Sequence, residues 1–217
     1  MTEPPTPIVK PGRIITMPSE AEIRGAFDPY VTAIGRVAYA WNYLHEILGR
    51  LFAAVTGADP GIILAVWYST ESDRTQREML RAAIEAWAKS QRKSPSPTAH
   101  DDLLWLVNEA NKLADARNNA VHAPCSIYTS EHGTEVGAAF HTGHARARRL
   151  WGKNLIDEFL WCEECAETLS VFGVGAVAAF AIERNAWPHK PQIPSRNKKR
   201  TFEDLHRLRD VSAFPPP

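Results

Sequence analysis

The feature that most constrains the fold is an unbroken stripe of apolar side chains between Asp28 and Gly57. The stripe advances by three or four residues at each step, the spacing of a helix face packed in an antiparallel bundle or coiled coil. Asp28 and Pro29 suit a helix start, and Gly57 suits a helix end. We therefore expect one long helix, whose buried face carries Ile34, Val37, Trp41, Leu44, Leu48, Leu51 and Val55.

Further segments have the same helical period, so the expected fold class is all-α. Residues 123–152 interrupt the helical pattern. They include an alternating stretch with a His132-Gly133 turn, which favours a β-hairpin or an ordered loop. We expect an antiparallel up-and-down bundle of about four to five helices, with this loop or small hairpin inserted before the last long helix. The other helices are expected at 61–70, from Ser72 or Asp73 to about Ser90, from Thr98 or His100 to His122, and from after Gly152 to about Asn185.

A chain of 217 residues suits one domain with tails. Residues 1–27 are rich in proline at their start and lack a helical period, so we expect an extended N-terminal arm. Residues 28–187 form the helical domain. Residues 188–217 combine prolines with the basic run Arg196–Arg200, which predicts a Pro-rich basic tail.

The composition gives no sign of a membrane or of export. Acidic and basic residues balance at 25 each, so the net charge does not point to a polyanion or a lipid surface. Three cysteines and the lack of a signal-peptide pattern predict a cytoplasmic protein. The apolar run Leu169–Ile182 is too short to span a bilayer, so we expect a buried core or interface helix and no membrane partner.

The most informative polar residues lie at the end of the fourth expected helix. Its apolar face runs through Leu106, Ala110 and Leu113, and the same spacing places Arg117 where a core residue is expected. A guanidinium pointing inward costs free energy unless it is paired or reaches a wet cleft. Pro124 disfavours helix at the residue before it, so His122 falls at or near the last helical position.

This pattern, Arg117-Asn118 followed by His122 at the end of a bundle helix, resembles the Arg-x(4–6)-His motif of the HEPN superfamily (higher eukaryote and prokaryote nucleotide-binding domains). The resemblance covers the motif and the all-helical layout of about residues 28 to 186. It implies metal-independent cleavage of RNA with no cofactor, by a homodimer whose two motifs share one cleft. By the same resemblance, a free-standing domain of this kind often belongs to a toxin–antitoxin or phage-defence system, with an antitoxin or other regulatory partner.

The residue types fit such a reaction. Histidine can move a proton near neutral pH, and arginine places a fixed positive fork on phosphate oxygens. We therefore expect Arg117 and His122 to be catalytic, with Asn118 supporting them. Arg146, Arg148 and Arg149 follow in a basic stretch, and we expect them either to contact RNA or to be exposed to water.

Three alternatives stay open. Arg117 could bridge an acidic residue of a neighbouring helix while His122 only caps its own helix. The protein could instead be a non-catalytic helical dimer that binds a nucleotide or a partner protein. Finally, His141 and His144, together with Cys162 and Cys165, have zinc-ligand spacings, although two cysteines inside a helix lack the usual knuckle turn.

Two surface features bear on partners. On the expected helix between Asp28 and Gly57, a line of side chains that includes Tyr39 and Tyr43 favours a subunit interface over a plain amphipathic surface. Arg74, Arg77 and Arg81 form a polar line on helix three, which we interpret as a solvated face rather than a phosphate-binding stripe.

Overall fold

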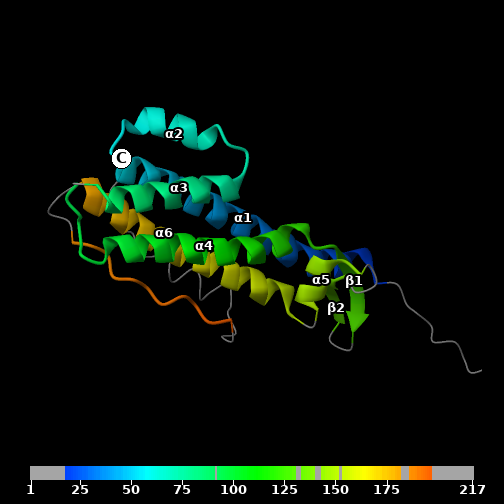
Figure 1. Ribbon diagram of the computed structural model, residues 1–217. Coiled ribbons are helices and arrows are strands. Elements are labelled where there is room, and N and C mark those ends of the chain that lie inside the picture. Colours follow the sequence, from blue (N-terminus) through cyan, green and yellow to red (C-terminus); the bar gives the residue numbers. More distant parts are fainter. Residues whose placement is uncertain are drawn as a thin grey trace, which may run out of the picture.

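Four long helices pack together as the body of the protein (Figure 1). The computed structural model describes residues 18–90, 92–130, 133–139, 143–151, 153–181 and 186–196. The long helices are α1 (Glu20–Thr56), α3 (Asp73–Ala88), α4 (Ala99–His122) and α6 (Leu155–Ala181). The short helix α2 (Pro60–Tyr68) packs on α1. Between α4 and α6 the chain forms β1 (Cys125–Ser130), β2 (Gly133–Ala138) and the short helix α5 (Ala145–Leu150).

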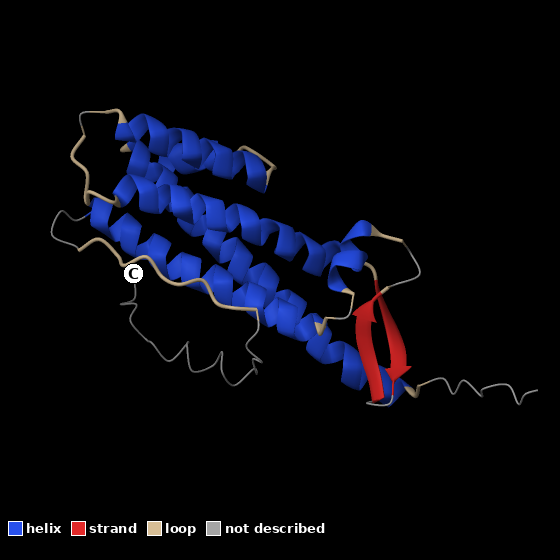
Figure 2. Ribbon diagram, turned by 60° about the horizontal axis from the view of Figure 1, so that its bottom comes forward, coloured by secondary structure: helices blue, strands red, loops and turns tan. Residues whose placement is uncertain are grey.

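This architecture confirms the expected helical fold and the small hairpin before the last long helix. The two strands are antiparallel, in a register that pairs Cys125 with Ala138 and Ser130 with Gly133. The hairpin packs against the N-terminal part of the body, chiefly on α1 (Figure 2). The ring of Tyr128 on β1 lies over Gly137 of β2, where an added Cβ would be only 2.5 Å from the ring. The helix α5 was not expected from the sequence.

The first helix begins earlier than predicted. Ser19 caps α1 through a capping box with Glu22, in which each side chain bonds the backbone of the other residue. Pro29, which we took as the first turn, lies inside the helix. The expected arm of residues 1–27 is therefore wrong from Glu20 onward, because the capping box sets the start; residues 1–17 lie outside the described residues.

The core forms where α1 meets α6, α3 and α4. Six of the seven predicted stripe residues of α1 are buried, and the seventh, Ile34, packs partly buried against the same core. Gly173 of α6 allows a close approach to α1, since an added Cβ there would lie 2.6 Å from Cγ2 of Ile47. The expectation that the apolar run Leu169–Ile182 belongs to a buried helix is thus met at Gly173.

The C-terminal segment, residues 186–196, corrects the expected boundary at residue 188. This segment runs back along the body as an extended chain (Figure 2). Trp187 donates its indole N–H to Asp102 of α4 at 3.0 Å, and the carbonyl of Pro194 accepts from the Trp161 indole of α6 at 2.8 Å. Part of the expected tail is therefore packed on the bundle. The rest of the basic run and the short helix expected at 202–209 lie outside the described residues.

By length and composition alone, α6 is apolar enough to cross a membrane. Its apolar side chains include Phe159, Leu169 and Phe172, which are buried in the core that α6 forms with α1 and α4. A core helix passes the same test, and the burial of these side chains matches that role.

The close approach of α1 and α6 can be tested with two glycine variants. Gly35 of α1 has no atom within 4 Å of an added Cβ, whereas Gly173 faces Ile47. Gly35→Ala should stabilise the fold by up to about 1 kcal/mol through helix propensity. The Gly173→Ala protein should have a free energy of unfolding about 1–3 kcal/mol lower than that of the Gly35→Ala protein, because the added methyl group overpacks the contact with Ile47. The free energy of unfolding in urea measures both. Equal effects of the two substitutions would contradict the close packing.

Candidate functional site

Arg117 points into the body of the bundle, as the apolar spacing of α4 predicts. Its guanidinium carbon lies 5.9 Å from the ring centroid of Trp41 on α1. Its Nη1 donates to the side-chain oxygen of Asn118 at 3.0 Å. Its Nε is buried and has no hydrogen-bond partner within the described part of the chain. The guanidinium is therefore half-buried and only partly satisfied.

A second arginine shares this environment. Arg77 of α3 is 4 % exposed, and its guanidinium carbon lies 5.4 Å from the same Trp41 ring. Its Nε donates to Asn111 of α4 at 2.7 Å, and its Nη1 lies 3.0 Å from Nε2 of His45. The interpretation of Arg77 as part of a solvated face is thus wrong.

The other two arginines of α3 differ from Arg77. Arg74 is exposed and pairs with Glu78 at 2.9 Å, as expected of a solvated face. Arg81 donates to Asn108 of α4. Arg77 differs because it falls between Gln76 and Leu80 on the buried face of α3. The sequence carried this signal: Arg77, Leu80, Ile84 and Trp87 follow one another at helical spacing.

The partners of His45 fix its charge state. Because Arg77 can only donate, Nε2 of His45 must accept, and its Nδ1 donates to Oε1 of Gln76 at 3.1 Å. The amide of Gln76 donates in turn to the Trp67 carbonyl at 3.0 Å. Burial lowers the pKa of His45, and the positive charge of Arg77 adds to the effect, although Asp73 opposes it. His45 is therefore neutral in the folded protein.

One carboxylate belongs to this junction. Oδ2 of Asp73, the first residue of α3, accepts the indole N–H of Trp41 at 2.9 Å. Among the described residues Arg117 makes no ion pair, so the alternative in which it bridges an acidic neighbour is not realised there. The guanidiniums of Arg77 and Arg117 thus leave the junction of α1, α3 and α4 with more positive than negative charge.

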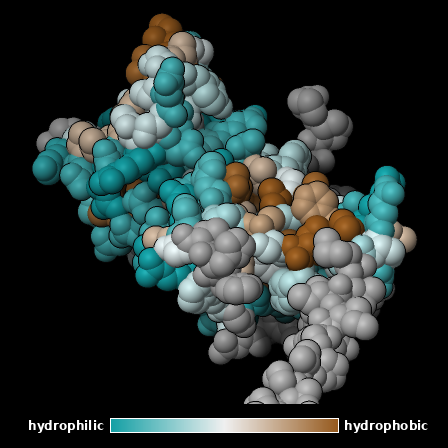
Figure 3. All heavy atoms as spheres, turned by 90° about the vertical axis from the view of Figure 1, so that its right-hand side faces the viewer, coloured by the Kyte–Doolittle hydropathy of each residue, from teal (hydrophilic) through white to brown (hydrophobic). Residues whose placement is uncertain are grey.

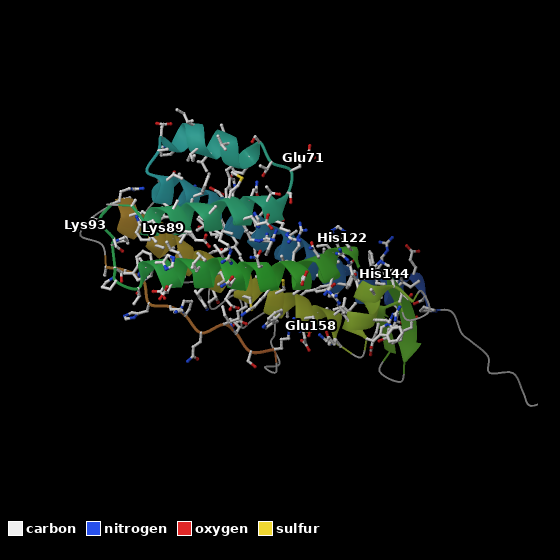
Figure 4. All side chains as sticks on the ribbon, in the orientation of Figure 1. Glu71, Lys89, Lys93, His122, His144 and Glu158 are labelled. Atoms are coloured by element: carbon white, nitrogen blue, oxygen red, sulfur yellow. The ribbon has the colours of Figure 1, made fainter. Side chains whose placement is uncertain are left out.

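His122 is the last residue of α4, as predicted, and it is exposed. Figure 4 shows it at the end of the bundle that also carries His144. His122 lies five positions after Arg117, which corresponds to about 140° around the helix axis. Arg117 accordingly faces Trp41 in the body, while His122 faces outward. The structure therefore brings Arg117 and Asn118 together, but does not bring His122 to them.

The three arginines after the hairpin lie in separate environments. Arg146 donates to the backbone carbonyl of Asn118 at 2.9 Å, so it binds the end of α4 directly. Arg148 is exposed and donates to the carbonyl of Gly143 at 3.1 and 2.6 Å. Arg149 lines a pocket between α4, α5 and α6. They do not form one continuous basic patch.

The residues of the zinc alternative are only partly described. Cys162 and Cys165 are buried on α6 and form no disulfide among the described residues, and burial raises the pKa of Cys162 to about 12, which disfavours the thiolate that zinc needs. His144 is exposed before α5, and His141 lies outside the described residues. Within the described ranges, no three His, Cys, Asp or Glu side chains are placed to hold a metal ion.

Apolar surface is exposed at the hairpin end of the molecule (Figure 3). A groove of about 730 Å³ lies there between α1, the hairpin and the start of α6. Tyr30, Tyr128 and Trp151 line it, whereas Arg117 and His122 do not. Elsewhere on α1, Tyr39 is 68 % exposed, so the predicted tyrosine interface remains available to a partner.

Comparison of the chain with protein-family models, with curated proteins and with solved structures gave no match. The assignment of function therefore depends on the residues and their geometry.

The neutral His45 predicts a pH dependence of stability. Its folded-state pKa lies below the ordinary value of about 6.5 that the unfolded chain retains, so the unfolded state binds the proton more strongly. The contribution of His45 to the free energy of unfolding should be complete above about pH 6.5 and should decrease as the pH falls below that value. Urea unfolding between pH 7.5 and 5 measures this decrease.

His45→Gln is the matched variant, because glutamine can accept from Arg77 and donate to Gln76 without titrating. Its stability should fall less steeply than that of the wild type over the same pH range. Identical slopes for the two proteins would contradict the assignment of a buried, neutral His45.

Proposed function

We propose that the protein is a metal-independent endoribonuclease that acts as a homodimer. Arg117 supports this proposal most strongly. It occupies a core position of α4 beside a second buried arginine, and no carboxylate pairs with it among the described residues. A bundle designed only for stability would place an apolar residue there. An uncompensated cation suits the recognition of a phosphate group.

The proposed reaction uses the 2′-hydroxyl of RNA. The 2′-oxygen forms a bond to the adjacent phosphorus, and the bond from phosphorus to the 5′-oxygen of the next nucleotide breaks. One proton leaves the 2′-oxygen and one is delivered to the departing 5′-oxygen. The products are a 2′,3′-cyclic phosphate and a free 5′-hydroxyl, and no water or metal ion enters the balance.

His122 is the proposed proton-transfer group, because imidazole exchanges protons near neutral pH and this side chain is exposed. Arg117 is proposed to stabilise the charge that builds on the phosphate oxygens. Asn118 orients Arg117 through its side-chain oxygen. Since Arg117 and His122 diverge within one chain, we propose that a second copy completes the site.

A non-catalytic binding module is the second candidate. The divergence of Arg117 and His122 favours it, because the two side chains leave α4 about 140° apart around the helix axis. The exposed apolar side chains of α2, Ile62 and Val66, also suit a protein partner. Either candidate could operate in a toxin–antitoxin or defence system, where an antitoxin would be such a partner.

The ribonuclease proposal predicts that purified wild-type protein cleaves a mixed RNA pool in excess EDTA. Arg117→Ala and His122→Ala should each lower the cleavage rate by at least about 100-fold, because they remove charge stabilisation and proton transfer. Analysis of the product ends should detect cyclic phosphates. His122 is exposed, so its substitution should change the free energy of unfolding by no more than about 0.5 kcal/mol.

Two control variants replace an arginine and a histidine by alanine at positions away from Arg117 and His122. Arg24→Ala removes an exposed arginine of α1, and His100→Ala removes a histidine at the opposite end of α4. Both should cleave RNA like the wild type. Mixing Arg117→Ala with His122→Ala should restore about a quarter of the activity if one copy's arginine works with the other's histidine. A folded, dimeric wild type that leaves several RNAs intact would favour the binding module.

A further inference from the structure

A polar pocket lies on a different side of α4 from Arg117. It is an open pocket of about 360 Å³ bordered by α4, α5, the start of α6 and the C-terminal segment, and its side chain Arg149 is exposed. Ala116 and Asn119 of α4 line it, and they lie about 100–160° around the helix axis from Arg117. Figure 4 shows the pocket residue Glu158 below α4 and His122 above it.

The charges around this pocket are unequal. Four cationic side chains and two carboxylates line it, an excess of two positive charges, and Glu109, which pairs with one of the cations from outside the lining, lowers this excess to one. Glu158 accepts from Lys153 at 3.2 Å and lies 4.0 Å from Arg196. Lys112 pairs with Glu109, which is not among the pocket-lining residues. The cations are Lys112, Arg149, Lys153 and Arg196, and the carboxylates are Asp115 and Glu158.

Arg149 differs from the other cations of the pocket. It has no hydrogen bond or ion pair to any described residue, whereas Arg146 and Arg148 of the same short helix each bind a backbone carbonyl. An arginine carries five donors in a fixed fork that fits phosphate oxygens. Arg149 is therefore free to bind a ligand without breaking an existing interaction.

The remaining walls of the pocket limit the size and kind of ligand. Phe159, which is 2 % exposed, and Leu150 supply apolar surface, and Asn119 supplies a polar side chain. Arg196 stacks on Trp161 at 4.1 Å, which holds the C-terminal segment at the edge of the pocket. A pocket of about 360 Å³ is of the size that binds a small organic molecule.

We propose that this pocket binds a phosphomonoester. Such a group carries a charge of about −2 at neutral pH and offers three acceptor oxygens, which match the charge excess and the free donors of Arg149. The apolar wall at Phe159 and Leu150 receives the organic part of the ligand. The phosphomonoester can come from a small metabolite or from the terminal phosphate of a nucleic-acid strand.

Calorimetric titration with phenyl phosphate tests the site. Phenyl sulfate is the matched probe, since it has nearly the same shape but one negative charge. Phenyl phosphate should bind one per chain and at least about tenfold more tightly than phenyl sulfate. Arg149→Ala should weaken phenyl phosphate binding by at least about tenfold. Arg74→Ala, which removes an exposed arginine of α3, should leave it unchanged.

A second variant and a second probe complete the test. Lys112→Ala should also weaken binding, and circular dichroism verifies that each variant is folded. A DNA oligonucleotide with a 5′-phosphate that binds more tightly than its 5′-hydroxyl form, through Arg149, identifies a strand end as the source. Binding of phenyl phosphate alone identifies a small molecule. DNA has no 2′-hydroxyl, so these results are independent of the proposed RNA cleavage.

The proposal is overturned if wild-type protein does not bind phenyl phosphate, or if Arg149→Ala binds it as tightly as Arg74→Ala does. Equal binding of both oligonucleotides, unaffected by Arg149→Ala, together with no binding of phenyl phosphate, would also overturn it.

Discussion

The packing of Trp41 at the junction of α1, α3 and α4 is the interaction on which the candidate site depends. Its indole N–H is bound by Asp73 at the start of α3, its ring lies 4.8 Å from that of His45, and both Arg77 and Arg117 lie within 6 Å of its centroid. An aromatic face attracts a guanidinium, which offsets part of the cost of removing two cations from water. The same ring therefore holds the start of α3 against α1 and offers Arg117 of α4 an aromatic face inside the bundle.

The guanidinium groups of Arg77 and Arg117 differ in how many of their hydrogen-bond donors have partners at this junction. Arg77 is bound by Asn111 and by His45, and His45 in turn is bound by Gln76, so this chain of hydrogen bonds is continuous from α4 to Trp67 of α2. Arg117 has only Asn118, the residue next to it in the sequence. A complete network suits a structural role, whereas the buried, unpaired Nε of Arg117 leaves donor capacity for a ligand.

Much of the fold follows from the sequence, because the long apolar stripes leave few ways to bury them. The stripe predicts α1. Other local signals add to it: Pro124 predicts the end of α4, and the alternating stretch with its His132-Gly133 turn predicts the hairpin. The start of α1 was missed because Pro29 was given more weight than the capping box at Ser19. The packing of residues 186–196 could not be predicted, since an extended segment has no period, and its contacts come from distant residues such as Asp102 and Trp161. The burial of Arg77 has a signal in the helical spacing it shares with Leu80, Ile84 and Trp87. Its pairing with His45 has none, because it joins two helices that the sequence does not align.

If Arg117 binds a ligand and does not stabilise the fold, the Arg117→Met protein should reveal it by its stability. Methionine fills a similar volume against Trp41 without a charge, so urea unfolding should give a free energy equal to or higher than that of the wild type. Arg77→Met serves as the comparison and should destabilise the fold, because it leaves His45 and Asn111 without their partner. A marked loss of stability in Arg117→Met, similar to that of Arg77→Met, would show that Arg117 is a structural residue and would contradict the account.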